Sequence, residues 1–199
     1  SACLVGSEMC IRDSYGGAKL ASEAFISSYS YMNDYEVLIF RFPNVIGPGL
    51  THGVIFDFIR KLQRNPNELE ILGDGSQCKP YLYVLDLVDA INKYSHKDRN
   101  GVEIFNIGVD TATTVKEIAD MVCERMGLSN VTYKFTGGNV GWKGDVPAFQ
   151  YDLSKINRHS PYLSITLHKC YPYYLFGIST FPSSVYHSIA LRKFSITIV

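Results

Sequence analysis

The sequence lacks an excess of charge, paired cysteines and long apolar runs. Nineteen Lys and Arg residues balance nineteen Asp and Glu residues, so the overall charge favours neither nucleic acid nor an anionic membrane as a partner. The five cysteines show no C-x-x-C spacing, which argues against a metal site or a disulfide framework and favours a reduced, cytoplasmic compartment. No stretch approaches the roughly 18 apolar residues of a membrane-spanning helix, and no basic segment followed by an apolar one marks a secretory signal.

Acidic residues are absent from the last part of the chain, residues 159–199. This tail has seven serines and five tyrosines, and its apolar residues follow neither a period of 2 nor one of 3.6. One interpretation is a β-rich extension, since aromatic and β-branched residues favour strands. We favour the other, an out-of-frame tail, because composition and pattern both change abruptly here.

Residues 14–158 alternate between helix and strand signals. The strand signal at 37–42 is almost wholly apolar, which is typical of a strand covered on both faces of a parallel sheet. We predict helices over 14–33, 54–62, 86–94 and 114–126, and strands over 37–42, 69–71, 81–84, 102–107 and 131–135. This alternation predicts an α/β fold.

Two of these helices have further signals. Thr114 and Glu117 have the spacing of a capping box, and Gly127 stands where a C-terminal glycine belongs. The first helix has Ser14 as a candidate cap. Apolar residues recur along it at three- and four-residue steps, which predicts one apolar face: Ala18, Ala21, Phe25, Tyr29 and Met32.

The first helix also carries a tyrosine and a lysine four residues apart, Tyr15 and Lys19. Residues at i and i+4 are neighbours on one helix face. A lysine ammonium beside a tyrosine stabilises the phenolate form, which makes the tyrosine a usable general base for a sugar or alcohol hydroxyl. The spacing alone is common, so it needs support from the rest of the chain.

That support comes from six motifs in order. They are "SYGGAKLASE" from Ser14, "RFPNVIGPG" from Arg41, "THGVIFDFIRKL" from Thr51, "ILGDGSQCKPYLYVLDLVDAI" from Ile71, "FNIG" from Phe105 and "GDVPAFQYDLSKI" from Gly144. Together they resemble the extended short-chain dehydrogenase/reductase family, the NAD-dependent sugar-nucleotide epimerases and dehydratases. The "HGVI" and "GDVP" forms are most similar to UDP-glucose 4-epimerases. The resemblance implies the C-terminal part of a Rossmann-like doubly wound parallel sheet, intermixed with a smaller α/β substrate-binding domain, over residues 14–158.

The resemblance also implies site residues. Tyr15 is expected to be the catalytic base and acid and Lys19 to bind the nicotinamide ribose, both in contact with NAD. Pro43 and Val45 are expected near the nicotinamide, and Asn44 on the phosphate side of the substrate.

Further substrate contacts are implied along the next helix and strand. His52, Gly53 and Val54 are expected to begin the helix that covers the nucleotide, and Tyr83 and Asp86 to pack the sugar-nucleotide site. His52 has a structural alternative, and Asp86 has one as a helix cap.

Two lysines replace arginines of the resembling family. Lys79 stands where relatives have an arginine for the substrate phosphates, and Lys143 is the cation nearest to a second such position. A lysine keeps the charge but lacks the planar fork that grips a phosphate with two hydrogen bonds. We therefore expect weaker pyrophosphate binding.

The chain has only 14 residues before Tyr15. Family members need a G-x-x-G-x-x-G turn for the cofactor pyrophosphate and an acidic residue for its ribose, with a Ser or Thr ahead of the tyrosine. We therefore expect the back portion of an enzyme. "EMCIRDS" can be back-translated as GAG ATG TGT ATA AGA GAC AG, like the end of a transposon adapter, so we expect residues 1–13 to be a non-native leader.

The implied activity of the intact protein is the NAD-dependent interconversion of UDP-glucose and UDP-galactose through a 4-keto intermediate. The resemblance also implies that the intact protein can form a homodimer. A nucleotide-sugar 4,6-dehydratase and a 4-keto reductase remain alternatives within the family. A third alternative is a non-enzymatic fragment that binds a sugar nucleotide. Without its front half, the strand at 37–42 is expected to lose most of its sheet neighbours and to leave apolar surface and unpaired edges exposed.

Overall fold

The computed structural model describes residues 14–95, 101–159 and 195–198. The predicted leader, 1–13, and all of the tail from 160 except 195–198 lie outside the described residues. The helices are α2 (Ser14–Asn33), α3 (Val54–Arg64), α4 (Val84–Ser95), α5 (Val115–Arg125) and α6 (Ser154–His159). The strands are β1 (Val37–Arg41), β2 (Asn44–Ile46), β3 (Glu68–Ile71), β4 (Cys78–Lys79), β5 (Tyr81–Tyr83), β6 (Val102–Asn106), β7 (Thr113–Thr114), β8 (Thr132–Phe135) and β9 (Ser195–Ile198).

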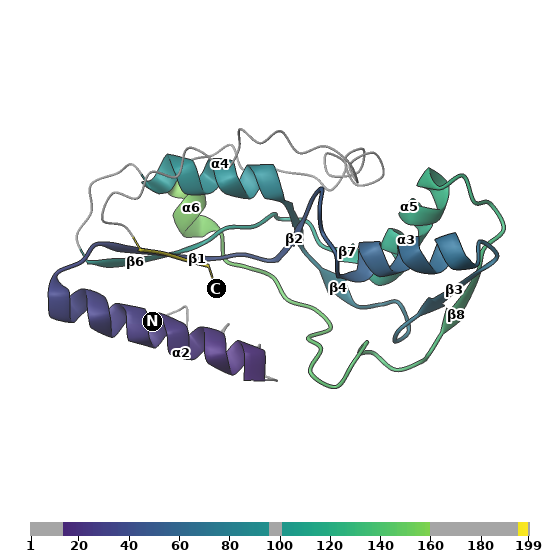
Figure 1. Cartoon of the computed structure of the whole chain (residues 1–199), viewed down its shortest axis with the longest axis horizontal. Coiled ribbons are helices and arrows are strands. Elements are labelled where there is room, and N and C mark those ends of the chain that lie inside the picture. The colour runs from purple at the N-terminus through teal and green to yellow at the C-terminus, as the bar shows by residue number, and fades with distance from the viewer. Residues whose placement is uncertain (1–13, 96–100, 160–194, 199) are drawn as a thin grey trace.

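A three-stranded parallel sheet in the order β6-β1-β9 forms one end of the molecule. Figure 1 shows α2 on one face of this sheet and α4 and α6 on the other. Val37 to Phe40 of β1 are all buried, because the strand has a neighbour on each edge and helices on each face. The expectation that this strand loses most of its sheet neighbours and has unpaired edges is wrong for the described residues, because β6 pairs with one edge and residues 195–198 pair with the other.

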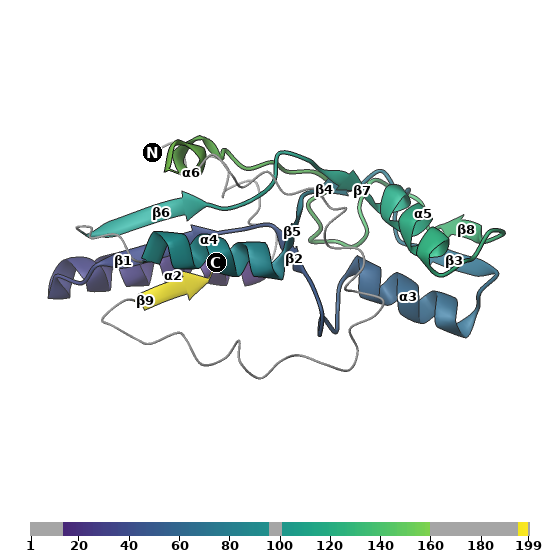
Figure 2. The same cartoon turned by 90° about the horizontal axis from the view of Figure 1, so that it is seen from above.

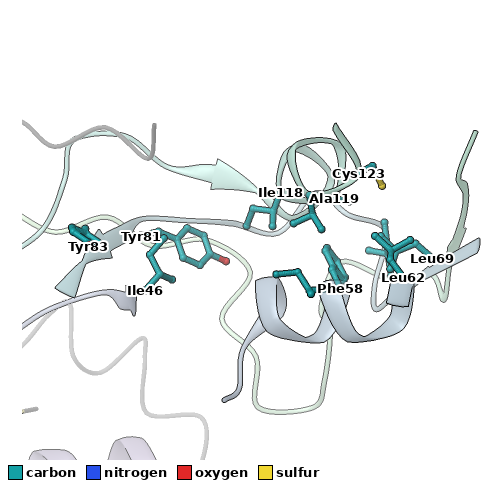
Figure 3. Close-up of a cluster of buried hydrophobic side chains, with 12 residues drawn as sticks. Ile46, Phe58, Leu62, Leu69, Tyr81, Tyr83, Ile118, Ala119 and Cys123 are labelled. Atoms are coloured by element: carbon teal, nitrogen blue, oxygen red, sulfur yellow. The ribbon is translucent and has the colours of Figure 1, made fainter. Parts of the chain in front are cut away.

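The other end of the molecule is built from two helices and a parallel strand pair. α3 and α5 pack beside the β3–β8 pair, and their apolar side chains form one buried cluster (Figures 1 and 3). Phe58 and Leu62 of α3 meet Ile118 and Ala119 of α5 in this cluster. A second cluster lies between the three-stranded sheet and the helices α4 and α6, and it contains Phe40 of β1 and Tyr94 of α4.

Two short strand pairs join these ends. β2 pairs parallel with β5, and β4 pairs antiparallel with β7. Figures 1 and 2 show both pairs between the three-stranded sheet and the α3–α5 end. These strands carry three of the candidate substrate residues, Asn44, Lys79 and Tyr83.

Helix α2 is the element that departs most from its predicted packing. Its buried residues are Glu23 and Ser30, while Phe25, Tyr29 and Met32 are exposed. Among the described residues, the apolar face of α2 is uncovered. The periodicity predicted the helix, but the apolar face that it marks is not the buried one.

The remaining differences are small. Helix α4 begins at Val84, so it takes the last residue of the predicted strand 81–84. The short elements β2, β4, β7 and α6 were not predicted. Of the described helices, none is long and apolar enough to cross a membrane.

Candidate functional site

Tyr15 and Lys19 lie together at the start of α2. The Lys19 Nζ atom is 5.3 Å from the centre of the Tyr15 ring. Tyr15 is 68% exposed. The end of α2 that carries the pair points toward the middle of the molecule, as Figure 1 shows. The predicted pairing of these two side chains on one helix face is therefore present.

A buried ion pair holds this helix against β1. Arg41, the last residue of β1, donates from Nε to Glu23 Oε1 over 2.7 Å and also bonds Glu23 Oε2 through its terminal nitrogen. Glu23 is only 6% exposed. Lys19 precedes Glu23 by one turn on the same side of α2. The ion pair thus fixes the segment with Lys19 relative to the strand that leads to Pro43.

The loop after β1 places Pro43, Asn44 and Val45 beside β5. Pro43 is buried, Val45 is half-buried and Asn44 is exposed at the start of β2. Asn44 is the register partner of Tyr81, and the two side chains are hydrogen-bonded. Burial, together with the negative charge of Asp145, raises the pKa of Tyr81 to about 12. Tyr81 is therefore a neutral hydroxyl at physiological pH.

Lys79 forms a largely buried ion pair with Asp145. The other carboxylate oxygen, Asp145 Oδ2, accepts a hydrogen bond from the Gly141 backbone at 3.0 Å. The Cys78 backbone donates to the Pro147 carbonyl over 2.7 Å, so the loop with Asp145 is fixed to β4. The predicted phosphate ligand Lys79 thus faces a carboxylate in the structure.

The sequence reasoning did not assign Tyr81 or Asp145 to the site. Tyr81 lies two residues after the expected Lys79, and Asp145 two residues after the expected Lys143. Asn44, Lys79, Tyr81 and Asp145 form one polar cluster between β2, β5 and the loop before α6. The motif "GDVP" was the signal that could have found Asp145.

The other expected residues are spread around this cluster. Val54 begins α3, and Gly53 is its N-cap with φ 90°, a left-handed conformation that favours glycine. His52 is exposed beside it. Tyr83 is buried in the apolar cluster of Figure 3, and Lys143 is exposed in the loop before Gly144. The roles of these residues stay predictions.

The arrangement offers two chemical functions. The Tyr15–Lys19 pair can exchange a proton with a hydroxyl group, because a nearby ammonium stabilises a phenolate. The Asn44–Lys79–Tyr81–Asp145 cluster combines amide, ammonium, phenol and carboxylate groups, which suit a polar ligand with phosphates and hydroxyls.

Known proteins are similar to this chain in sequence and in fold. The family described as "NAD dependent epimerase/dehydratase family" matches residues 6–108, just over half of the chain. A putative UDP-glucose 4-epimerase of Methanocaldococcus jannaschii is 35% identical over 118 residues, which are 57% of this chain and 37% of that protein. Human dTDP-D-glucose 4,6-dehydratase is 37% identical over 117 residues, 58% of this chain and 33% of that enzyme.

Among solved structures, a UDP-galactose 4-epimerase superposes with a TM-score of 0.63 and 36% identity, covering 74% of this chain and 46% of that one. The chain thus spans only about a third to a half of the proteins that it matches. The similarity confirms the α/β fold with parallel strands that the sequence predicts. Sequence motifs, fold and matched residues agree, and the chain belongs to the NAD-dependent epimerase/dehydratase family, a family of enzymes.

Proposed function

We propose that this chain is part of an NAD-dependent epimerase that interconverts UDP-glucose and UDP-galactose. The observation that carries the proposal is the Tyr15–Lys19 pair, which is exposed at the start of α2 in a chain of this family. Similarity to a putative UDP-glucose 4-epimerase and to the structure of a UDP-galactose 4-epimerase supports the specific reaction.

In this proposal Tyr15 transfers the proton, and Lys19 stabilises the negative charge on the phenolate of Tyr15. Tyr15 takes the proton from the 4-hydroxyl group of the sugar and later returns it. Lys19 stabilises the phenolate in between. NAD bound beside this pair would supply the redox chemistry, as acceptor and then donor of a hydride at C4. The sugar loses and regains one proton and one hydride, so its 4-keto form leads to the epimer with no net oxidation.

The described residues fit the nicotinamide end of the cofactor. The Lys19 ammonium and the Tyr15 hydroxyl are donors for its ribose at an exposed helix start. Pro43, which is buried, and the half-buried Val45 follow β1 and are the apolar residues proposed for the nicotinamide end. Asn44, Lys79 and Lys143 would hold the UDP group of the substrate, with His52, Gly53 and Val54 at its edge and Tyr83 beneath it.

The test begins with the source DNA. Sequencing across the Ser14 and Arg158 codons shows whether the natural reading frame diverges at either point. The protein encoded by the natural frame is then purified and assayed for conversion of UDP-galactose to UDP-glucose. We expect turnover that falls by at least about 10²-fold in Tyr15→Phe, because the general base is lost. Tyr31→Phe, an exposed tyrosine on the same helix, is the matched control.

Two results would contradict the proposal. One is full turnover in Tyr15→Phe. The other is a source sequence that encodes all 199 residues in one natural frame, which would leave sugar-nucleotide binding as the function. The 199-residue chain itself is expected to show no epimerase turnover.

A nucleotide-sugar 4,6-dehydratase is the second candidate, because human dTDP-D-glucose 4,6-dehydratase is 37% identical to this chain. The same purified protein distinguishes the two. Formation of a 4-keto-6-deoxy sugar from dTDP-glucose, without epimerisation of UDP-galactose, would favour the dehydratase.

The proposal includes a homodimer for the intact protein. The exposed apolar residues Phe25, Tyr29 and Met32 on α2 support a contact through this helix. Sedimentation of the complete protein measures the association state, and a monomer at all concentrations would rule the dimer out.

A further inference from the structure

Trp142 is the only tryptophan of the sequence, and it lies in the loop that leads to Asp145. It is 55% exposed, although large aromatic side chains are usually well buried. The loop is next to the polar cluster of Asn44, Lys79, Tyr81 and Asp145. An exposed indole beside such a cluster calls for a reason.

The indole of Trp142 packs against Gly144. A methyl group built on Gly144 would lie 2.3 Å from Trp142 Cζ3 and 2.6 Å from Cη2. Gly144 does not have a positive φ, so its backbone does not require glycine. The space that the missing side chain leaves is filled by the benzene part of the indole. The glycine at position 144 therefore allows the indole of Trp142 to take this position in the loop.

The loop around Trp142 is fixed at both ends. The Asp145 backbone donates to the Trp142 carbonyl over 3.0 Å, and the Gly141 backbone donates to the Asp145 carboxylate over 3.0 Å. Asp145 is in turn paired with Lys79. A fixed loop presents the indole without the entropy loss of ordering it when a ligand binds.

We propose that Trp142 is the stacking platform for the nucleobase of the substrate. The inference rests on the proposed function, and it names the part of the sugar nucleotide that the loop holds. Aromatic side chains bind bases by stacking because every base has a π-face. Lys143, next to Trp142, supplies positive charge for the diphosphate, whereas the charge of Lys79 is balanced by Asp145. Base and phosphates are then recognised by one loop.

The test uses the 199-residue chain and the fluorescence of Trp142, which no other tryptophan obscures. UDP, UMP and glucose 1-phosphate are titrated in turn, with calorimetry as a second measure of binding. We expect UDP and UMP to quench the fluorescence and glucose 1-phosphate to leave it unchanged.

Variants separate stacking from folding. Trp142→Ala is expected to weaken UDP binding by about tenfold in calorimetry, the loss of one stacked base, while Trp142→Phe retains most of it. Gly144→Ala is expected to weaken UDP binding similarly, because its methyl group displaces the indole. Circular dichroism checks that each variant is folded.

The outcomes also separate this inference from the proposed function. UDP binding by calorimetry with unchanged fluorescence, and with equal affinity in Trp142→Ala, would overturn the stacking role and leave the proposed function intact. Equal quenching by glucose 1-phosphate would assign the platform to the sugar instead, against our inference. If no probe binds, the stacking role and the proposed sugar-nucleotide site in this chain both fail.

Discussion

Tyr81 is the residue of the polar cluster whose ionisation the fold changes most clearly. Its pKa rises from 10.0 to about 12, first through burial and then through the charge of Asp145. The folded state therefore holds the proton more tightly than the unfolded state. This stabilisation is fully present below pH 10 and is lost as the pH rises from about 10 to about 12. Two pKa units correspond to about 3 kcal/mol.

We predict that Tyr81→Phe removes this part of the alkaline destabilisation. Urea unfolding at pH 8 and at pH 11, for both proteins, measures it. At pH 8 the variant should be less stable by about 1 kcal/mol, because the hydrogen bond with Asn44 is lost. At pH 11 the difference should shrink or reverse. A constant difference at both pH values would show that Tyr81 titrates normally.

The Lys79–Asp145 pair leads to a second residue-scale prediction. Asp145 is buried, so Lys79→Ala leaves a carboxylate without its cation. We expect the free energy of unfolding at pH 7 to fall by about 3 kcal/mol. Lys79→Arg keeps the charge and is the matched control. A loss of less than about 0.5 kcal/mol in Lys79→Ala would show that the pair contributes as little as an exposed one.

Helix α2 depends on one polar contact at the scale of the element. Because its buried positions are Glu23 and Ser30, the ion pair with Arg41 takes the place of an apolar seam. We predict that Glu23→Ala lowers the free energy of unfolding by about 3 kcal/mol. Hydrogen exchange should also speed up in α2 more than in α4. Glu124→Ala, an exposed glutamate on α5, is the control and should change little.

Charge exchange tests the same contact from the other side. Glu23→Arg combined with Arg41→Glu should recover part of the stability that either single change loses. If the loss in the free energy of unfolding of the double variant equals the sum of the losses of the two single variants, the two residues are not coupled. The pair would then not be what holds α2 on β1.

The elements that the sequence predicted share a long, regular pattern. The capping box of α5 is present, with Glu117 donating its backbone N–H to Thr114 Oγ1 at 3.1 Å and Thr114 donating to Glu117 Oε2 at 2.7 Å. Local signals of this kind fix a helix end by themselves. The buried face of α2 could not be predicted in the same way. It is fixed by Arg41, which is 18 residues away in the sequence.

At the scale of the whole molecule, the candidate site contains one residue pair that is close in the sequence and one that is far apart in it. The Tyr15–Lys19 pair is local, so its spacing was enough to predict that the two side chains lie together, but their role needed the motifs in the rest of the chain. The Lys79–Asp145 pair spans 66 residues and needs both the β4 strand and the loop after β8. A single sequence shows the two residues but not their contact. The resemblance supplied Lys79, and only the fold showed what it faces.

The exposed apolar face of α2 gives the last prediction. Phe25, Tyr29 and Met32 follow one another at steps of four and three residues, so they share one side of the helix, opposite Glu23. Contiguous exposed apolar residues bind hydrophobic dyes and promote association. We predict that this chain enhances the fluorescence of anilinonaphthalene sulfonate and associates at rising concentration in sedimentation.

The double variant Phe25→Ser with Met32→Ser should reduce both effects by more than half. Leu85→Ser, on α4, removes an exposed apolar residue elsewhere and should reduce neither. Because Ser also lowers helix propensity slightly, circular dichroism must show α2 intact in the double variant. Dye binding that persists undiminished in a folded double variant would mean that the accessible apolar surface lies elsewhere than on α2.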